Sequence, residues 1–253
     1  LQIRRLSDGY YWSAVDNQWG AGVSTITAPT YIDVFTDSFT TKTANLPKPP
    51  TDLASGSSYY VTASAVDNAD ATGNAEAFYV KGSTFSVDYS SPTTGISYPL
   101  NLSTRSALGY ISGTSLDEPQ GAAYVRAGIS EVKLRVQRLT SDTTTYWDGV
   151  SEWMNGPVWI STLPGWQYSV MPVWQHNTRY VISAKAVEAA GNQETDFTLN
   201  VDTISVLFDL IKPTATPLSP APGGYVNANL TSISGTADDV PSDISGLNIA
   251  LSS

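Results

Sequence analysis

Cysteine is absent from this chain of 253 residues, and histidine occurs once. The lack of cysteine excludes disulfides, thiol catalysis and thiolate metal sites. Histidine-based catalysis or metal binding would depend on His176 alone, whose sequence Trp174-Gln-His-Asn-Thr is typical of a polar turn. No hydrophobic run reaches the roughly 18 residues that a membrane-spanning helix needs. The sequence therefore predicts no thiol- or histidine-based catalysis and no membrane span.

Charged residues are also scarce, at 14% of the chain, compared with roughly 25% in average soluble proteins. Ser, Thr, Gly and Asn supply the polarity instead, which suits strands and turns better than helix surfaces. Apolar residues make up 41% of the chain, enough for packed cores. No stretch keeps helical periodicity for more than two turns, so the composition predicts an all-β protein.

The charge that is present is mostly negative, with a formal net charge of −10. An acidic surface repels phosphate backbones, and Arg4-Arg5 is the only dense basic cluster, so we predict no nucleic-acid partner. The chain starts with Leu1-Gln-Ile-Arg-Arg-Leu6, without a signal peptide or an initiator Met. This start suggests a processed product or a part of a longer protein.

One stretch occurs twice. Tyr59-Tyr-Val-Thr-Ala-Ser-Ala-Val-Asp67 matches Tyr180-Val-Ile-Ser-Ala-Lys-Ala-Val-Glu188 at an offset of 121 residues, and each copy leads to a Gly-Asn pair. The alternating side chains predict a strand, and Gly-Asn predicts a tight turn after it. Other segments recur at offsets of 121 to 135 residues: Leu1–Leu6 with Leu134–Leu139, Trp12 and Trp19 with Trp147 and Trp153, Asp88–Pro92 with Asp209–Pro213, and Ile111–Thr114 with Ile233–Thr236.

These offsets divide the chain into one complete repeat and two partial repeats. Residues 93–213 form the complete unit. Residues 1–92 lack its opening strands, and residues 214–253 consist only of opening strands. The two partial units are complementary, because joining residue 253 to residue 1 restores a full repeat to within one residue.

The motifs together resemble a known family. Tyr146-Trp147-Asp-Gly, the repeated Ala-rich strand with its Gly-Asn turn, and Ile111-Ser-Gly-Thr114 look like bacterial Ig-like repeats, which are similar to fibronectin type III modules. The first copy departs from the pattern at Ser13-Ala14, which replace Asp148-Gly149. The resemblance implies tandem antiparallel seven-stranded β-sandwiches, an extracellular or cell-surface location, and a spacer, adhesive or structural role without catalytic residues.

The complementary ends predict a rod or filament built by copies of the chain arranged head to tail. Either the 253 residues are one period of a longer covalent chain, or separate subunits complete each other's sandwich by strand complementation. The break falls inside a strand, which favours the continuous chain. We expect Leu1 and Ile3 at one end, and Ile249 and Leu251 at the other, to form the contact.

The tryptophans suggest an alternative function as an adhesin or carbohydrate-binding module, whose partner would be a cell-surface polysaccharide or protein. Trp12 and Trp19 recur at matched positions, which favours a core role for them and for their counterparts. Nothing in the first copy matches Trp159, Trp166 and Trp174, so these three are the candidate ligand or interface aromatics.

Acidic residues gather near the ends of the repeats and could converge on Ca²⁺, which takes about six to eight oxygen ligands. None lies in a recognisable calcium-binding loop, and solvated turn carboxylates are the commoner outcome. We therefore predict no resident cofactor or defined metal ligands, with Ca²⁺ as the alternative. The sequons at Asn101 and Asn229 also match the N-glycosylation pattern. The acids considered are Asp67, Asp70, Asp88, Asp117, Glu118, Glu188, Asp202, Asp209, Asp238, Asp239 and Asp243.

Overall fold

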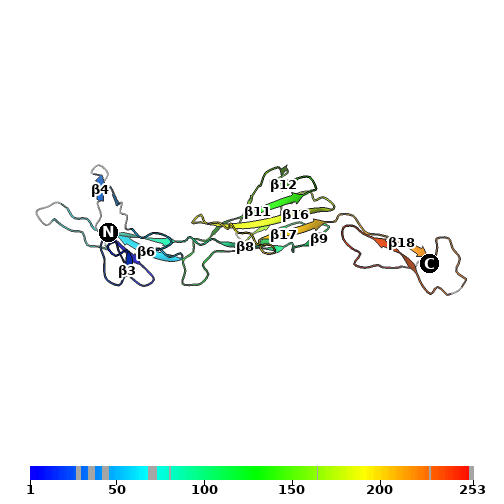
Figure 1. Ribbon diagram of the computed structural model, residues 1–253, viewed down its shortest axis with the longest axis horizontal. Helices are drawn as coiled ribbons and strands as arrows, with labels where there is room; N and C mark the ends of the chain where they lie inside the picture. Colours follow the sequence, from blue (N-terminus) through cyan, green and yellow to red (C-terminus); the bar gives the residue numbers. More distant parts are fainter. Residues whose placement is uncertain are drawn as a thin grey trace. The chain divides into compact units, whose positions relative to one another are not determined.

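A computed structural model describes most of the chain (Figure 1). The residues whose structure it describes are 1–26, 30–33, 38–41, 46–67, 73–79, 81–163, 165–227 and 229–250. These residues form strands and no helix, which confirms the predicted all-β class. Accordingly, no helix in this part of the chain has the length and hydrophobicity to cross a membrane.

The chain divides into two compact units. Unit 1 contains residues 1–92 together with two later segments, 117–128 and 188–192. Unit 2 contains residues 93–116, 129–187 and 193–253. The main division thus falls between Pro92 and Thr93.

Unit 1 contains a five-stranded antiparallel sheet in the order β3-β2-β1-β6-β7. Trp12 and Tyr59 are fully buried on this sheet and pack with Ile3, Ile26 and Leu53. A second, two-stranded sheet pairs β4 with β5. The strands are β1 (Gln2–Arg5), β2 (Tyr11–Ser13), β3 (Gln18–Gly20), β4 (Thr30–Asp33), β5 (Ser38–Thr41), β6 (Ser57–Thr62) and β7 (Gly82–Val87).

Unit 2 contains a large sheet in the order β13-β12-β11-β16-β17-β9, with β14 also paired to β11, and a smaller sheet in the order β15-β10-β8. A separate pair, β18-β19, follows near the end of the chain. The strands are β8 (Thr93–Tyr98), β9 (Ser103–Arg105), β10 (Ile111–Leu116), β11 (Ile129–Leu139), β12 (Thr144–Trp147), β13 (Trp153–Met154), β14 (Ile160–Thr162), β15 (Gln167–Tyr168), β16 (Thr178–Glu188), β17 (Thr203–Phe208), β18 (Thr214–Ser219) and β19 (Ser234–Asp238).

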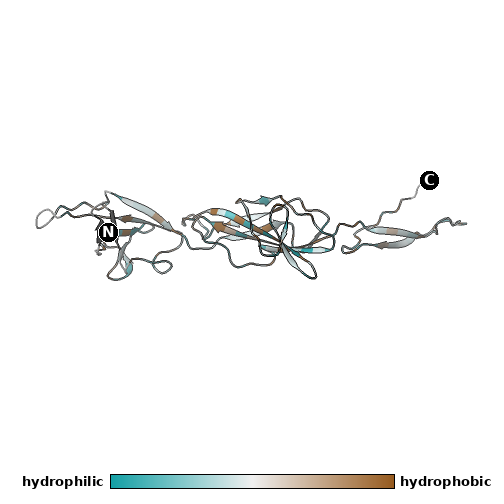
Figure 2. Cartoon of the chain, turned by 90° about the horizontal axis from the view of Figure 1, so that it is seen from above, coloured by the Kyte–Doolittle hydropathy of each residue, from teal (hydrophilic) through white to brown (hydrophobic). Residues whose placement is uncertain are grey.

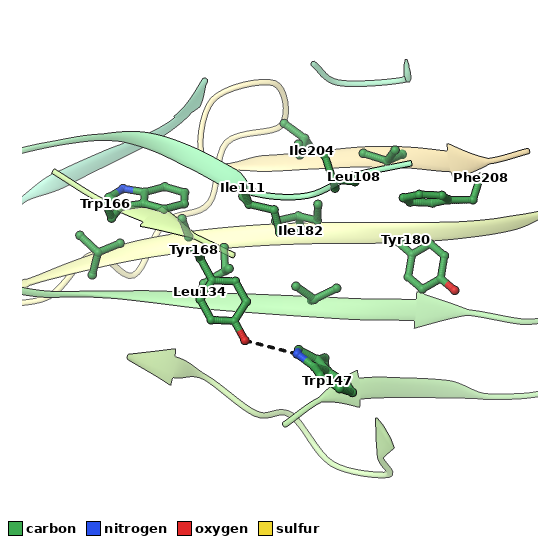
Figure 3. Packing of buried hydrophobic residues seen from close by; sticks show 14 of the residues in the cluster. Leu108, Ile111, Leu134, Trp147, Trp166, Tyr168, Tyr180, Ile182, Ile204 and Phe208 are labelled. Carbon is green, nitrogen blue, oxygen red and sulfur yellow. Dashed lines mark hydrogen bonds between the residues drawn. The ribbon is translucent and has the colours of Figure 1, made fainter. Parts of the chain in front are cut away.

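The core of unit 2 lies between its large and small sheets, which gives a sandwich-like arrangement (Figure 3). Along β11 every second residue is buried, at Val132, Leu134 and Val136, because successive side chains of a strand point to opposite faces. Hydrophobic and hydrophilic residues accordingly alternate along the strands of this unit in Figure 2. Ile111 of β10 and Trp166, which precedes β15, close the core from the other side.

The sandwich differs in two details from the seven-stranded antiparallel module that the resemblance implies. The described residues between Thr93 and Phe208 form ten strands, and the long β11 pairs with β12 at one end and with the short β14 at the other. In addition, β9 pairs with β17 in the parallel direction.

The sheet of unit 1 repeats the topology of the large sheet of unit 2. The order β3-β2-β1-β6-β7 corresponds strand for strand to β13-β12-β11-β16-β17. Equivalent pairs share their register: Trp12 lies opposite Trp19 as Trp147 lies opposite Trp153. The hydroxyl of Tyr180 accepts a hydrogen bond from a backbone N–H five residues upstream, and Tyr59 does the same. The long repeat in the sequence is thus a repeat of sheet structure.

The pair β18-β19 in turn repeats the pair β8-β10. Gly235 lies opposite Pro217 as Gly113 lies opposite Ile96, and both pairs have a register shift beside this position. What differs is the burial of equivalent residues. Leu108, which precedes β10, is 5% exposed in the core of unit 2, whereas Leu230, at the same place before β19, is 45% exposed. Among the described residues, β18-β19 therefore has the strand pairing of its counterpart without the burial.

Candidate metal centre

Three carboxylates meet within unit 1. Asp88 directly follows β7, Asp117 directly follows β10, and Glu188 is the last residue of β16. One carboxylate oxygen from each of the three lies within 4.8 Å of the corresponding oxygens of the other two. The cluster is thus made of residues that are far apart in the sequence.

Backbone hydrogen bonds from the segment 117–128 position two of these acids. The N–H of Ala127 donates to Asp88 Oδ2 at 3.0 Å, and the N–H of Gly128 donates to Asp117 Oδ2 at 2.6 Å. The segment is itself anchored, because Val125 N–H donates to the carbonyl of Gly56 at 2.8 Å. Asp117 therefore has one oxygen fixed by a backbone donor, and Asp88 has both, because the N–H of Ser90 donates to its Oδ1 at 3.2 Å.

The tight turn after β16 positions the third acid. Gly191 adopts a φ of 94°, the left-handed region that favours glycine, and thereby closes the turn that the Gly-Asn pair predicts. Asn192 then donates its side-chain Nδ2 to Glu188 Oε1 and, at 3.0 Å, to the carbonyl oxygen of Asp88. The asparagine of the repeated motif therefore links two of the three acids.

Two of the three acids are deeply buried, Asp88 is half-buried, and part of the cluster has no hydrogen-bond donor. Glu188 is 1% exposed and Asp117 is 8% exposed. Within the described part of the chain, Glu188 Oε2 and Asp117 Oδ1 are buried atoms without a hydrogen-bond partner. Buried carboxylate oxygens are normally hydrogen-bonded, so each of these two atoms requires a physical explanation.

Three negative charges are also electrostatically unfavourable at this position. Burial is the main reason that the pKa of Glu188 rises to about 7. The hydrogen bond that a protonated Glu188 makes with Asp117, and the negative charges of Asp88 and Asp117, raise this pKa further. The ion pairs between described residues include none of these three acids.

The other predicted carboxylates have different roles. Asp67 accepts hydrogen bonds from Asn74 of its own turn, and Asp202 accepts two from the N–H of Thr198. In unit 2, the hydroxyl of Ser242 donates to Asp209 Oδ2 and Asp239 Oδ2. Asp70 lies outside the described residues. These four described acids therefore accept hydrogen bonds within turns and loops.

The three candidate tryptophans do not form one face. Trp166 is buried in the core of unit 2. Trp174 stacks on Phe208 with ring centroids 4.3 Å apart, and its Nε1 donates to the carbonyl of Leu108. Trp159 is half-buried, as Trp174 is, but it lies outside the core and stacks on Phe197, which is exposed. No signal in the sequence around Trp166 separates it from Trp159.

The predicted head-to-tail contact residues also differ in their surroundings. Ile3 is buried in the core of unit 1, and Leu1 packs against that core. Ile249 of unit 2 is exposed. Leu251 lies outside the described residues. The single histidine, His176, accepts a hydrogen bond at Nδ1 from the N–H of Leu210 and lies 3.3 Å from Asp209.

The fold places the chain in the class of all-β proteins with a sandwich-like core. Comparison with known proteins adds no closer assignment, since no family model, no curated protein and no solved structure matches the chain.

Proposed function

We propose that this chain is a non-enzymatic structural protein whose sandwich modules continue head to tail into a rod or filament outside the cell. The observation that carries the proposal is the contrast between Leu108, buried under the large sheet of unit 2, and the exposed Leu230 of β18-β19. A strand pair with the register of β8-β10 needs an opposing sheet to bury its apolar residues. The sheet of unit 1 has the same strand order as the large sheet of unit 2, so a sheet of this order is the opposing sheet that we propose.

The opposing sheet comes from a following stretch of the same polypeptide or from another copy of the chain. Both versions make the same heterologous contact, which propagates instead of closing. The extracellular location is part of the proposal and rests on the resemblance to bacterial Ig-like repeats. A structural Ca²⁺ ion at the acidic cluster of unit 1 is compatible with this role, because calcium commonly stabilises extracellular modules.

A tandem protein in which residue 253 of one copy precedes residue 1 of the next tests this proposal. We expect the junction to form a third cooperative unfolding transition in calorimetry, absent from the single chain. Leu230→Asp in the first copy should remove that transition, because a buried charge without a partner costs several kcal/mol. The matched control is Val150→Asp, an apolar-to-charged change at an exposed loop position of the same unit.

The oligomeric state of the single chain distinguishes complementation between subunits from covalent continuation. Complementation between subunits predicts concentration-dependent oligomers in sedimentation velocity, and the Leu230→Asp variant should remain monomeric. A chain that is always monomeric, together with the extra tandem transition, supports covalent continuation. A monomeric chain whose tandem shows no new transition would contradict the proposal.

Saccharide binding remains a second candidate function because of one surface group in unit 2. Half-buried Trp159 stacks on exposed Phe197. Arg135 Cζ and Lys185 Nζ lie 4.7 Å and 4.8 Å from the centroid of the Trp159 ring. An aromatic platform beside two cations suits a sugar that carries carboxylate groups. Trp166 and Trp174, by contrast, serve the core.

Affinity electrophoresis in gels containing a uronic-acid polysaccharide tests this candidate. We expect retardation of the wild type, and about a tenfold loss of affinity in Trp159→Ala, because stacking on the ring is removed. Tyr225→Ala, at a fully exposed tyrosine of the same unit, is the control. Equal migration of the wild type with and without polysaccharide would eliminate the candidate.

A further inference from the structure

We infer that Asp88, Asp117 and Glu188 form a Ca²⁺ site within unit 1. The site needs neither assembly nor a neighbouring copy, because all three carboxylates belong to one unit of one chain. It is therefore independent of the proposed structural function.

The geometry of the cluster fits a single ion. Calcium holds its oxygen ligands at about 2.3–2.6 Å, so two ligands on opposite sides of one ion lie up to about 5 Å apart. The three carboxylate oxygens lie within 4.8 Å of one another, which is inside that limit. One ion can therefore lie close to all three oxygens.

The hydrogen bonds leave specific atoms available to the ion. Backbone N–H groups donate to Oδ2 of Asp88 and of Asp117, and Asn192 donates to Oε1 of Glu188. The other oxygen of Asp88, Oδ1, accepts from the Ser55 hydroxyl and the Ser90 N–H. The atoms without a donor are Asp117 Oδ1 and Glu188 Oε2, and both are buried. A cation at the cluster would supply the missing partner for both oxygens. The surrounding donors hold each carboxylate in place before the ion arrives.

The charges of the cluster point to a divalent cation. Buried carboxylates are stable only when they are protonated, paired or bound to metal. No Lys or Arg among the described residues forms an ion pair with these three acids. An ion with two positive charges offsets two of the three negative charges of the cluster.

The identity of the ligand atoms selects among the divalent cations. The cluster contains only oxygen donors, which suit the hard cations Ca²⁺ and Mg²⁺ better than Zn²⁺. Mg²⁺ demands a near-ideal octahedron and usually keeps several waters. Glu188 and Asp117 are both more than nine-tenths buried, which leaves little space for a water-rich shell. Calcium, with its more flexible geometry, is the better fit.

Such an ion would connect three segments that lie far apart in the sequence. Asp88 directly follows β7 in unit 1. Asp117 is the first residue of the segment 117–128, and Glu188 is the first residue of the turn 188–192. The last two segments are the later parts of the chain that belong to unit 1. Bound calcium would hold both of them to residues 1–92.

Isothermal titration of the full chain with CaCl₂, after removal of metal with EGTA, tests the site. We expect one ion per chain with a dissociation constant of about 10⁻⁴ M, the range of extracellular calcium modules. Glu188→Gln and Asp117→Asn should each weaken binding at least tenfold. Asp239→Asn, which removes the same charge at an acid bonded to Ser242 in unit 2, should bind as the wild type does.

The difference in melting temperature between Glu188→Gln and the wild type should change sign when calcium is added. This change separates metal binding from a merely structural role of Glu188. Without calcium, Glu188→Gln should melt at the same temperature as the wild type or higher, because it removes a buried charge. With calcium, only the wild type should gain stability, so the variant should melt lower than the wild type. This comparison also shows that the variant folds.

Several outcomes would overturn the site. A wild type that shows neither binding heat nor a melting shift up to 10 mM CaCl₂, roughly a hundredfold the expected dissociation constant, would exclude the site. Binding that survives both Glu188→Gln and Asp117→Asn would place the ion elsewhere. MgCl₂ that competes with calcium at equal concentration would show that the assignment to calcium is wrong.

Discussion

Replacement of Trp166 by alanine is expected to lower the free energy of unfolding of unit 2 by about 3–5 kcal/mol, as for other buried tryptophans. The side chain is 2% exposed and lies between the two sheets of that unit, close to Ile111 (Figure 3). Its removal leaves a cavity that the surrounding strands cannot close, because their backbones are paired in both sheets.

The indole nitrogen of Trp166 makes the expected result more specific. Trp166 Nε1 is buried and has no acceptor among the described residues. An unpaired buried donor is unfavourable by about 1–3 kcal/mol. We therefore expect Trp166→Phe, which removes the donor and keeps most of the apolar volume, to cost much less than Trp166→Ala.

Urea denaturation followed by circular dichroism measures both variants. The transition of unit 2 should move, while that of unit 1, which lacks this residue, should stay in place. Trp159→Ala is the matched control, because Trp159 is a tryptophan of the same unit outside the buried core. Equal loss of stability in Trp166→Ala and Trp159→Ala would contradict the assignment of Trp166 to the core.

Much of the architecture could be predicted from the sequence. The alternation in Tyr59–Asp67 and Tyr180–Glu188 predicts two similar strands, and the structure contains them as β6 and β16 at the same place in two sheets of the same order. Local alternation determines which face of a strand is buried, so a repeated pattern indicates a repeated sheet. The short strands β14 and β15 were beyond prediction, because two or three residues show no period.

The candidate site shows where prediction from the sequence ends. The sequence indicates several groups of acids near the ends of the repeats, and the cluster takes one acid from each of three groups. Asp88 and Asp117 meet because the segment 117–128 returns to residues of unit 1 through Val125 and Ala127. Such contacts depend on long-range packing, which no local pattern encodes. Trp166 illustrates the same limit, since burial and exposure look alike in a loop sequence.

The repeated Ile-Ser-Gly-Thr motif has a physical explanation in the structure. A Cβ at Gly113 would lie 2.0 Å from the carbonyl oxygen of Gly95 and 2.5 Å from Cζ2 of Trp166. A Cβ at the equivalent Gly235 would lie 2.4 Å from the carbonyl oxygen of Thr216. In both copies the glycine thus lies directly against the backbone of the neighbouring strand, beside the register shift, where no side chain fits.

Gly113→Ala is therefore expected to destabilise unit 2 by about 3 kcal/mol, the upper end of the range for overpacking. The closest atom is a backbone oxygen of β8, so the strands must separate to relieve the contact. Gly109→Ala is the matched control: no atom lies within 4 Å of its Cβ position, and we expect a change below about 0.5 kcal/mol. Urea denaturation measures both.

Trp166→Phe should not rescue Gly113→Ala, because the contact with Gly95 persists. Rescue would show instead that the indole ring is the main obstacle, and a Gly113→Ala variant as stable as Gly109→Ala would show that β8 and β10 are not packed this closely.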